Sequence, residues 1–314
     1  MKVLLFTHKN DIDGMGNAIL SQLAFDEVDY VLCATFDLTK SVENYLKDKS
    51  IYNYDRVYVT DLCLEEPVLT IIAEDESLKG KVRVFDHHKT FAEPKYTKHD
   101  FITVKLEDEK GLCCGTSLFY QHLLDEGFIS KDDKATAEFV ELTRQHDTWE
   151  WKNIYNNEKS RELSILFDSL GYDGYITLMT EKLKKEKNTF EFDSMEETLI
   201  NNRKKQIALK CEYYANEIYY REILGMKAGI VFITYEYRNE LAEYFRENNF
   251  DMDFAMMIAL DPGVVTYRSV RDGIHVRPVA ELFGGKGHEK AATNPITEEM
   301  QTEIIKVLTK KENN

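Results

Sequence analysis

The stretch KVRVFDHHKT, Lys81–Thr90, joins a short apolar run directly to an aspartate and two histidines. The run at 82–85 has the composition of a buried strand. Side chains alternate along a strand, so Asp86 and His88 are expected on one side and His87 on the other. The chain holds only eight histidines, and two of them at one strand end single out this position as a candidate site.

The sequence around this stretch alternates between strand and helix patterns. Apolar residues recur at helical spacing in 14–27 and 65–76, and the segments 113–126 and 132–146 also read as helices. The predicted strands of this half are 3–7, 29–35, 56–60, 82–85 and 101–106. Such alternation predicts an α/β fold with a mostly parallel sheet and helices on both of its faces.

Length and composition favour two domains. The chain has 314 residues, of which 43% are hydrophobic. We expect a catalytic α/β domain at 1–160, a polar and charged helical linker at 161–222, and a smaller α/β domain at 223–314. The last domain is predicted to contain strands at 227–235, 253–260 and 264–270 and a closing helix at 296–311.

Charge and cysteine content limit the possible partners and the compartment. A net charge of −16 disfavours long DNA or RNA, whose binding depends on lysine and arginine, and favours a small anionic substrate held at a local positive site. Bound metal ions could supply that positive charge. The five cysteines form no CxxC pair, and neither a signal peptide nor a membrane span is recognisable. The expected location is therefore the reducing cytoplasm, without membrane contact.

Acids and histidines follow three of the predicted strands. The candidate metal ligands are His8, Asp11 and Asp13 after the first strand, Asp61 after the third, His87 after the fourth, and Asp147 after a predicted helix. Each alone could be a turn or capping residue. Together they meet at the carboxyl edge of one parallel sheet, where such folds bind ligands. Four carboxylates with imidazoles and no thiolate predict two divalent ions that share a carboxylate, with Mn²⁺ favoured and Mg²⁺ or Co²⁺ possible.

The motifs THKNDIDG, VTDLC, VFDHHKT and QHDTWEW resemble, in order, the metal motifs of the DHH phosphoesterases. YRSVRDGIHVRPVAELFGGKGHEKAA resembles the glycine-rich DHHA1-type accessory domain of that family. The resemblance implies His8 and Asp11 on one metal, Asp13, His87 and Asp147 on the other, Asp61 bridging both with a catalytic role, and His88 facing the scissile phosphate. It further implies that the substrate is bound by Arg268, Ser269, Gly284, Gly285, Gly287 and His288.

Three features depart from the family pattern or have an ordinary explanation. Lys286 interrupts the glycine-rich loop, and Thr293 stands where a glycine is usual. Lys286 could add positive charge for a 5′-phosphate or simply be tolerated in a loop. The segment GLCCGTS at 111–117 reads as a helix start capped by Thr116 or Ser117.

The resemblance implies a phosphodiesterase of the nanoRNase type, a manganese-dependent oligoribonuclease with 3′–5′ exonuclease polarity. It would hydrolyse short oligoribonucleotides and dinucleotides to nucleoside 5′-monophosphates through a hydroxide held between the two metals, as a possible homodimer. The accessory domain argues against the inorganic pyrophosphatase branch, and the negative charge argues against a processive exonuclease. Two alternatives stay open: hydrolysis of another small phosphate compound, such as a cyclic dinucleotide or 3′-phosphoadenosine 5′-phosphate, and an inactive nucleotide sensor. The complete set of metal acids disfavours the sensor.

Overall fold

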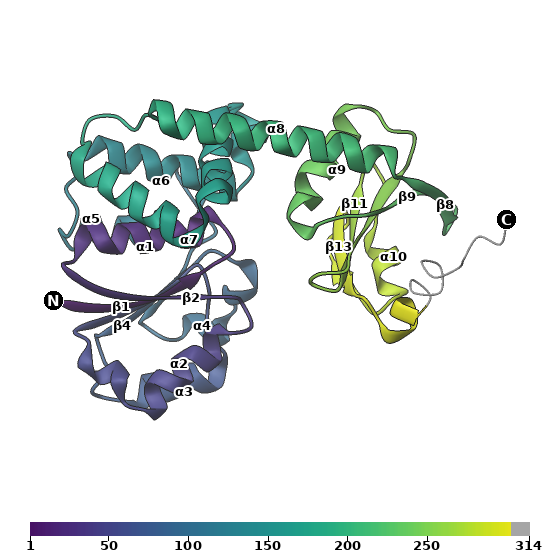
Figure 1. The fold of residues 1–314 in the computed structure, drawn as a ribbon. Coiled ribbons are helices and arrows are strands. Elements are labelled where there is room, and N and C mark those ends of the chain that lie inside the picture. The colour runs from purple at the N-terminus through teal and green to yellow at the C-terminus, as the bar shows by residue number, and fades with distance from the viewer. Residues whose placement is uncertain (303–314) are drawn as a thin grey trace. The chain divides into compact units, whose positions relative to one another are not determined.

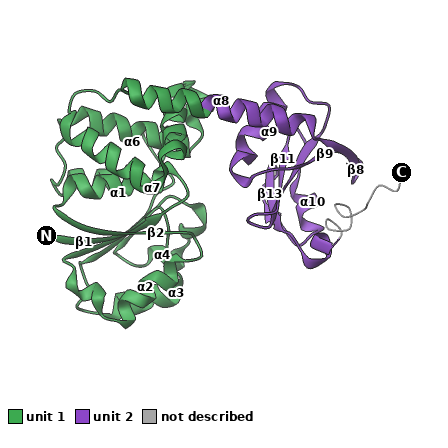
Figure 2. Ribbon diagram, in the orientation of Figure 1, with its two compact units in different colours: residues 1–203 green, residues 204–314 purple. Residues whose placement is uncertain are grey.

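The computed structural model describes residues 1–302, which form two compact units. Unit 1 contains Met1–Arg203, and unit 2 begins at Lys204 (Figure 2). The division falls within the helix α8, Ser194–Asn216. Residues 303–311 of the predicted closing helix lie outside the described part of the chain.

Unit 1 is built on a five-stranded, all-parallel sheet with the order β2-β1-β3-β4-β5. Every one of these strands matches a predicted strand to within two residues. Their bounds are β1 Lys2–His8, β2 Glu27–Cys33, β3 Arg56–Thr60, β4 Val82–Asp86 and β5 Ile102–Val104. The predicted α/β class and the parallel sheet are confirmed.

Helices cover both faces of this sheet, as Figure 1 shows. On one face, Val3 and Leu5 of β1 share a core with α1 (Ile12–Ala24), α5 (Gly115–Asp125), α6 (Lys134–Asp147) and α7 (Glu158–Lys185). On the other face, Leu4 and Phe6 pack with α2 (Leu38–Lys47) and α3 (Glu66–Glu74). A parallel sheet buried on both faces needs strands that are apolar on both sides, which explains the continuous apolar runs in the sequence.

Short elements connect this framework near its carboxyl edge. The helix α4 (Pro94–Thr97) precedes β5, and a two-stranded hairpin of β6 (Glu107–Asp108) and β7 (Gly111–Leu112) precedes α5. A π-helical turn at Trp151–Tyr155 follows α6. Within the range 161–222, α7 buries Leu163, Leu166 and Tyr175 in the same core as α1.

Unit 2 holds a six-stranded mixed sheet with the order β12-β13-β11-β10-β9-β8. Its strands are β8 Tyr219–Ile223, β9 Met226–Phe232, β10 Phe254–Ala259, β11 Val264–Ser269, β12 Lys286–Gly287 and β13 Ala291–Pro295. The helix α9 (Arg238–Glu247) packs on one face, and α10 (Arg277–Glu281) packs on the other. Among residues 1–302, no helix has both the length and the apolar character needed to cross a membrane.

Candidate metal centre

All six predicted metal ligands lie at the carboxyl edge of the unit 1 sheet or at the helix ends that meet it. His8 ends β1, Asp11 is the N-cap of α1, and Asp13 lies in the first turn of that helix. Asp61 follows β3, His87 follows β4, and Asp147 is the last residue of α6. Their potential ligand atoms form overlapping groups within 4.8 Å: His8 with Asp11 and Asp61, Asp13 with His87 and Asp147, and Asp61 with His87 and His88.

Asp61 connects the groups because its two carboxylate oxygens face different imidazoles. Its Oδ2 lies 3.6 Å from Nδ1 of His8, which also lies 2.7 Å from Oδ2 of Asp11. Its Oδ1 lies 3.2 Å from Nε2 of His87, and that nitrogen is 3.7 Å from an oxygen of Asp13 and of Asp147. A carboxylate that faces two ligand groups with separate oxygens has the arrangement required to bridge two ions.

The electrostatics of this cluster favour a bound cation. Burial, followed by the charges of Asp13 and Asp11, raises the pKa of Asp61 well above its usual range. Burial and the charge of Asp13 do the same to the pKa of Asp147. The Oδ2 atom of Asp61 is also buried without a hydrogen-bond partner, which is unusual for a carboxylate oxygen. The oxygen and imidazole donors therefore fit divalent ions of the Mn²⁺ or Mg²⁺ type.

Asp13 is held in place by the N-terminus of α5. Its Oδ2 accepts a hydrogen bond from the backbone N–H of Gly115, and its Oδ1 accepts one from the backbone N–H of Thr116, both at 2.7 Å. The Thr116 hydroxyl donates to the carbonyl oxygen of Asp13 at 2.6 Å. The N-cap of this helix is Cys114, and the Ser117 hydroxyl completes a capping box by accepting the Cys114 backbone N–H at 3.0 Å. Capping by Ser117 is therefore confirmed, whereas capping by Thr116 is wrong, because Thr116 lies inside the first turn and binds Asp13.

A buried ion pair fixes the segment that leads into α5. Arg144 Nη1 donates to the carbonyl oxygen of Leu112 at 2.8 Å and forms an ion pair with Glu150 Oε2 at 2.5 Å. Glu150 Oε1 accepts a hydrogen bond from the Leu112 backbone N–H at 3.1 Å. The guanidinium also forms two hydrogen bonds with Glu141. This ion pair joins the end of α6, which carries Asp147, to the hairpin before α5. The first turn of α5 in turn binds the Asp13 carboxylate.

Asp86 orients His88. Its Oδ1 accepts hydrogen bonds from Nδ1 and the backbone N–H of His88, at 2.7 and 2.8 Å. Asp86 is fully buried, whereas the side chain of His88 is half exposed. The Asp86 hydrogen bond raises the pKa of His88. With Nδ1 bound to Asp86, the Nε2 atom is left for a ligand. The sequence placed Asp86 and His88 on one side of the strand but did not assign this orienting role to Asp86.

Comparison with known proteins adds independent evidence. The chain is 31% identical over 298 residues to oligoribonuclease NrnB of Bacillus subtilis (strain 168), across 94% of this chain and 73% of the relative. This chain belongs to the DHH phosphoesterases. The predicted family is thereby confirmed. The DHH motif after which it is named is Asp86, His87 and His88 in this chain. No family model matches the chain.

Two solved structures share the DHH phosphoesterase fold with this chain. One is the pGpG-specific phosphodiesterase PggH from Vibrio cholerae, with a TM-score of 0.55 and 13% identity over 98% of this chain and 97% of the other. The second is the DHH domain of a member of the s1p family of ribosomal proteins, with a TM-score of 0.51 and 13% identity over 98% and 86%. At these identities the likeness concerns the fold alone.

Apart from His88, the predicted substrate-binding residues of this DHH phosphoesterase lie in unit 2. Arg268 on β11 pairs with Ala291 on β13, and the carbonyl oxygen of Ala291 accepts the backbone N–H of His288 at 2.8 Å. Arg268 and His288 are therefore attached to the same position of β13. The Arg268 guanidinium donates to Oδ1 of Asn239 at 3.1 Å, and burial, followed by Arg238, lowers its pKa to about 10. A bound anion would offset the burial and the like charge that disfavour this partly buried guanidinium.

Two glycines of the glycine-rich loop, Gly285 and Gly287, have little space for a side chain. A Cβ on Gly285 would lie 2.6 Å from the carbonyl oxygen of Thr293, and Gly287 has a φ of 152°. Gly284 also has a positive φ, of 71°. Lys286 pairs with Thr293 across β12 and β13, so both departures from the family pattern occupy one strand pair. The Ser269 hydroxyl donates to the carbonyl oxygen of Arg271 at 2.7 Å.

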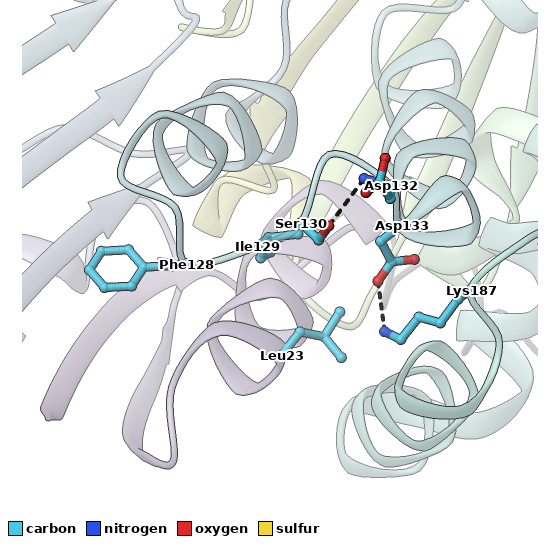
Figure 3. Close-up of a pocket in the computed structure, with 7 residues that line it drawn as sticks. All are labelled: Leu23, Phe128, Ile129, Ser130, Asp132, Asp133 and Lys187. Carbon is cyan, nitrogen blue, oxygen red and sulfur yellow. Dashed lines mark hydrogen bonds and ion pairs between the residues drawn. The ribbon is translucent and has the colours of Figure 1, made fainter.

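A cavity of about 280 Å³ lies in another part of unit 1 (Figure 3). It is lined by Leu23, Phe128, Ile129, Ser130, Asp132, Asp133 and Lys187. Leu23 is near the C-terminal end of α1, whereas Asp11 and Asp13 are at the N-terminal end of that helix. The Asp133 carboxylate caps α6 and accepts from Lys187 at 2.7 Å, so these two charged groups of the cavity already have partners.

Proposed function

We propose that this DHH phosphoesterase is a metal-dependent phosphodiesterase that hydrolyses short oligoribonucleotides and dinucleotides to nucleoside 5′-monophosphates. The observation that carries the proposal is the position of Asp61, whose two oxygens face the two separate groups of ligand atoms. The 31% identity to an oligoribonuclease supports the substrate class. The net charge of −16 supports a short substrate, because a long polyanion would be repelled by most of the surface.

The proposed cofactors are two divalent ions, with Mn²⁺ favoured because the donors combine carboxylates with imidazoles. His8, Asp11 and Asp61 would hold one ion, and Asp61, Asp13, His87 and Asp147 would hold the other. Such ions supply a low-pKa water and neutralise the charge of the phosphoryl group. The proposed location is the cytoplasm, a reducing compartment that suits five cysteines without a disulfide.

His88 is the proposed contact to the scissile phosphate. Asp86 accepts from its Nδ1 and so orients the ring, and this carboxylate also favours the protonated imidazole. A protonated His88 can donate from Nε2 to a phosphate oxygen or to the departing ribose oxygen. His87, which faces Asp61, has a different role as a ligand.

Unit 2 is the proposed binding region for a second part of the substrate. Arg268, His288 and the backbone of Gly284, Gly285 and Gly287 would hold a phosphate that is not cleaved. Ser269 has a weaker claim to direct contact, because its hydroxyl already donates within its own loop. Binding energy from a remote phosphate would position the reacting bond and set the preferred substrate length.

A substrate panel with Mn²⁺ tests this proposal. We expect rapid cleavage of a 5′-phosphorylated ribodinucleotide and slow cleavage of a 24-nucleotide RNA and of inorganic pyrophosphate. Faster turnover of a cyclic dinucleotide or of 3′-phosphoadenosine 5′-phosphate would replace the proposed substrate. Binding of a dinucleotide without cleavage of any compound would indicate a sensor instead of an enzyme.

A further inference from the structure

Trp149 lies two residues after Asp147 in a backbone conformation that is unfavourable for a large side chain. Its φ is 61°, in the left-handed region, where bulky residues are rare because Cβ approaches the carbonyl oxygen. Trp149 is nonetheless 43% exposed, so burial of its indole ring does not fully offset the energetic cost of this conformation. Strained residues of this kind concentrate at functional sites.

The neighbours of Trp149 determine this conformation. Glu150 and Trp151 are both only 5% exposed. Glu150 is fixed by Arg144 and by the backbone N–H of Leu112, and the ring of Trp151 packs under the guanidinium of Arg161 at 5.8 Å. The following residues are therefore anchored inward. Trp149 is left at the surface, with its ring centroid 6.4 Å from that of Trp151.

The backbone of Trp149 is close to the candidate metal centre. Consecutive Cα atoms are about 3.8 Å apart, so the Cα atoms of Trp149 and Asp147 are separated by at most about 7.6 Å. The backbone N–H of Trp149 donates to the carbonyl oxygen of His146 at 3.1 Å, which fixes the turn. Asp147 itself lies 3.7 Å from His87. An exposed aromatic residue on a hydrogen-bonded turn thus lies two residues after a residue proposed to bind a metal ion.

We propose that Trp149 is a stacking platform for a nucleobase next to the cleaved phosphate. The inference rests on the proposed function and deepens it, because it makes the nucleobase part of what the site recognises. An exposed aromatic ring can stack on any base, so this contact favours nucleotides without selecting a sequence. Inorganic phosphate compounds offer nothing for the ring to bind.

Substitution by glycine and by phenylalanine tests the role without loss of folding. Glycine adopts the left-handed conformation without strain, so the backbone at position 149 should not destabilise the Trp149→Gly variant. Trp149→Gly should lower kcat/KM for a ribodinucleotide by roughly 5- to 150-fold, which corresponds to the loss of one base stack. Trp149→Phe should retain most of the activity. A dinucleotide analogue without the stacked base should be cleaved equally by wild type and Trp149→Gly.

Two results would overturn the inference: an unchanged kcat/KM of Trp149→Gly for the dinucleotide, or an equal loss on the abasic analogue, which would indicate a structural role. If the wild-type protein cleaved no dinucleotide, the proposed function would fail, and a binding measurement would then decide the role of Trp149.

The chain has two tryptophans, Trp149 and Trp151, so its fluorescence can report nucleotide binding. With Mn²⁺ present, 5′-AMP should quench the fluorescence of wild type but not of Trp149→Phe, and inorganic phosphate should quench neither. Equal quenching of both proteins by 5′-AMP would refute base stacking on Trp149.

Discussion

The Asp13 carboxylate and the backbone N–H of Gly115 are joined by a 2.7 Å hydrogen bond, although 102 residues separate them in the chain. Thr116 donates to the other oxygen at the same distance, so the first turn of α5 fixes the orientation of this carboxylate. The N-terminus of a helix also carries partial positive charge, which stabilises an ionised carboxylate. A proposed metal ligand is thereby held rigid before any ion binds.

The first prediction concerns the close approach of Gly115 to this cluster. A Cβ at position 115 would lie 2.6 Å from Cβ of Asp61 and 3.0 Å from Oδ2 of Asp13. Gly115→Ala should therefore displace both carboxylates and reduce the rate of dinucleotide cleavage at least ~10-fold, because misplaced catalytic groups are costly. Gly174→Ala in α7 is the matched control, since its Cβ meets only Leu170 at 3.4 Å. It should keep full activity and raise the free energy of unfolding by about 0.5–1 kcal/mol. Full activity of Gly115→Ala would show that a Cβ at position 115 does not displace the carboxylates of Asp61 and Asp13.

The second prediction concerns removal of the metal. Protein treated with EDTA should lose phosphodiesterase activity, and Mn²⁺ should restore it better than Mg²⁺ or Co²⁺. Because ions bind the folded state selectively, added Mn²⁺ should also raise the midpoint of thermal unfolding in a concentration-dependent manner. Activity assays and thermal scans on the same samples measure both effects. Undiminished turnover in metal-free protein would refute the two-metal proposal.

The third prediction concerns two properties of Asp61: its proposed role as the bridging carboxylate and its raised pKa. Asp61→Asn should reduce activity on the order of 10³-fold, because an amide cannot bridge two ions as a carboxylate does. The folded-state pKa of Asp61 is raised above the usual 3.8, so its stabilising contribution is present below that pH and is lost as the pH rises through the folded pKa.

Without metal, Asp61→Asn should therefore lose less stability than wild type as the pH rises above 3.8. Thermal unfolding in EDTA over a series of pH values above 3.8 measures the difference. The variant should also show a smaller stabilisation by Mn²⁺ than wild type. An identical pH dependence of both proteins would show that Asp61 is not destabilised by its acidic neighbours.

The fourth prediction concerns unit 2. His288→Ala should reduce kcat/KM for a dinucleotide by roughly 10- to 100-fold, as expected for the loss of a charge-assisted hydrogen bond of about 1.5–3 kcal/mol. The small ester bis-p-nitrophenyl phosphate has only one phosphate group and cannot also occupy a second phosphate site, so its hydrolysis should change little.

His275→Ala is the matched control within the same unit. His275 is also exposed, and its Nε2 lies 3.7 Å from Glu289, outside the glycine-rich loop. This variant should cleave both substrates like wild type. An equal loss of His288→Ala on both substrates would place His288 in the bond-breaking step, and no loss on either would make the loop purely structural.

The five strands of unit 1 and the positions of the acids after them could be predicted from the sequence alone. Strands buried on both faces require continuous apolar runs, and these runs end abruptly at His8, Asp61 and Asp86. Strands β8 and β13 and the two-residue strands β6, β7 and β12 were not predicted. The sequence of β13, AATNP, has little intrinsic preference for a strand, and it becomes one through its pairing with β11.

The sequence thus determined which residues stand at the carboxyl ends of parallel strands, because local apolar pattern and strand direction are sufficient for that. The tertiary structure alone decided how these residues are held: Asp13 by the first turn of α5, the hairpin before α5 by Arg144 and Glu150, and Trp149 at the surface just before two buried residues. These contacts join segments that are distant in sequence or depend on the burial of adjacent side chains. The local sequence pattern does not indicate such contacts, since they form only when the helices pack on the sheet.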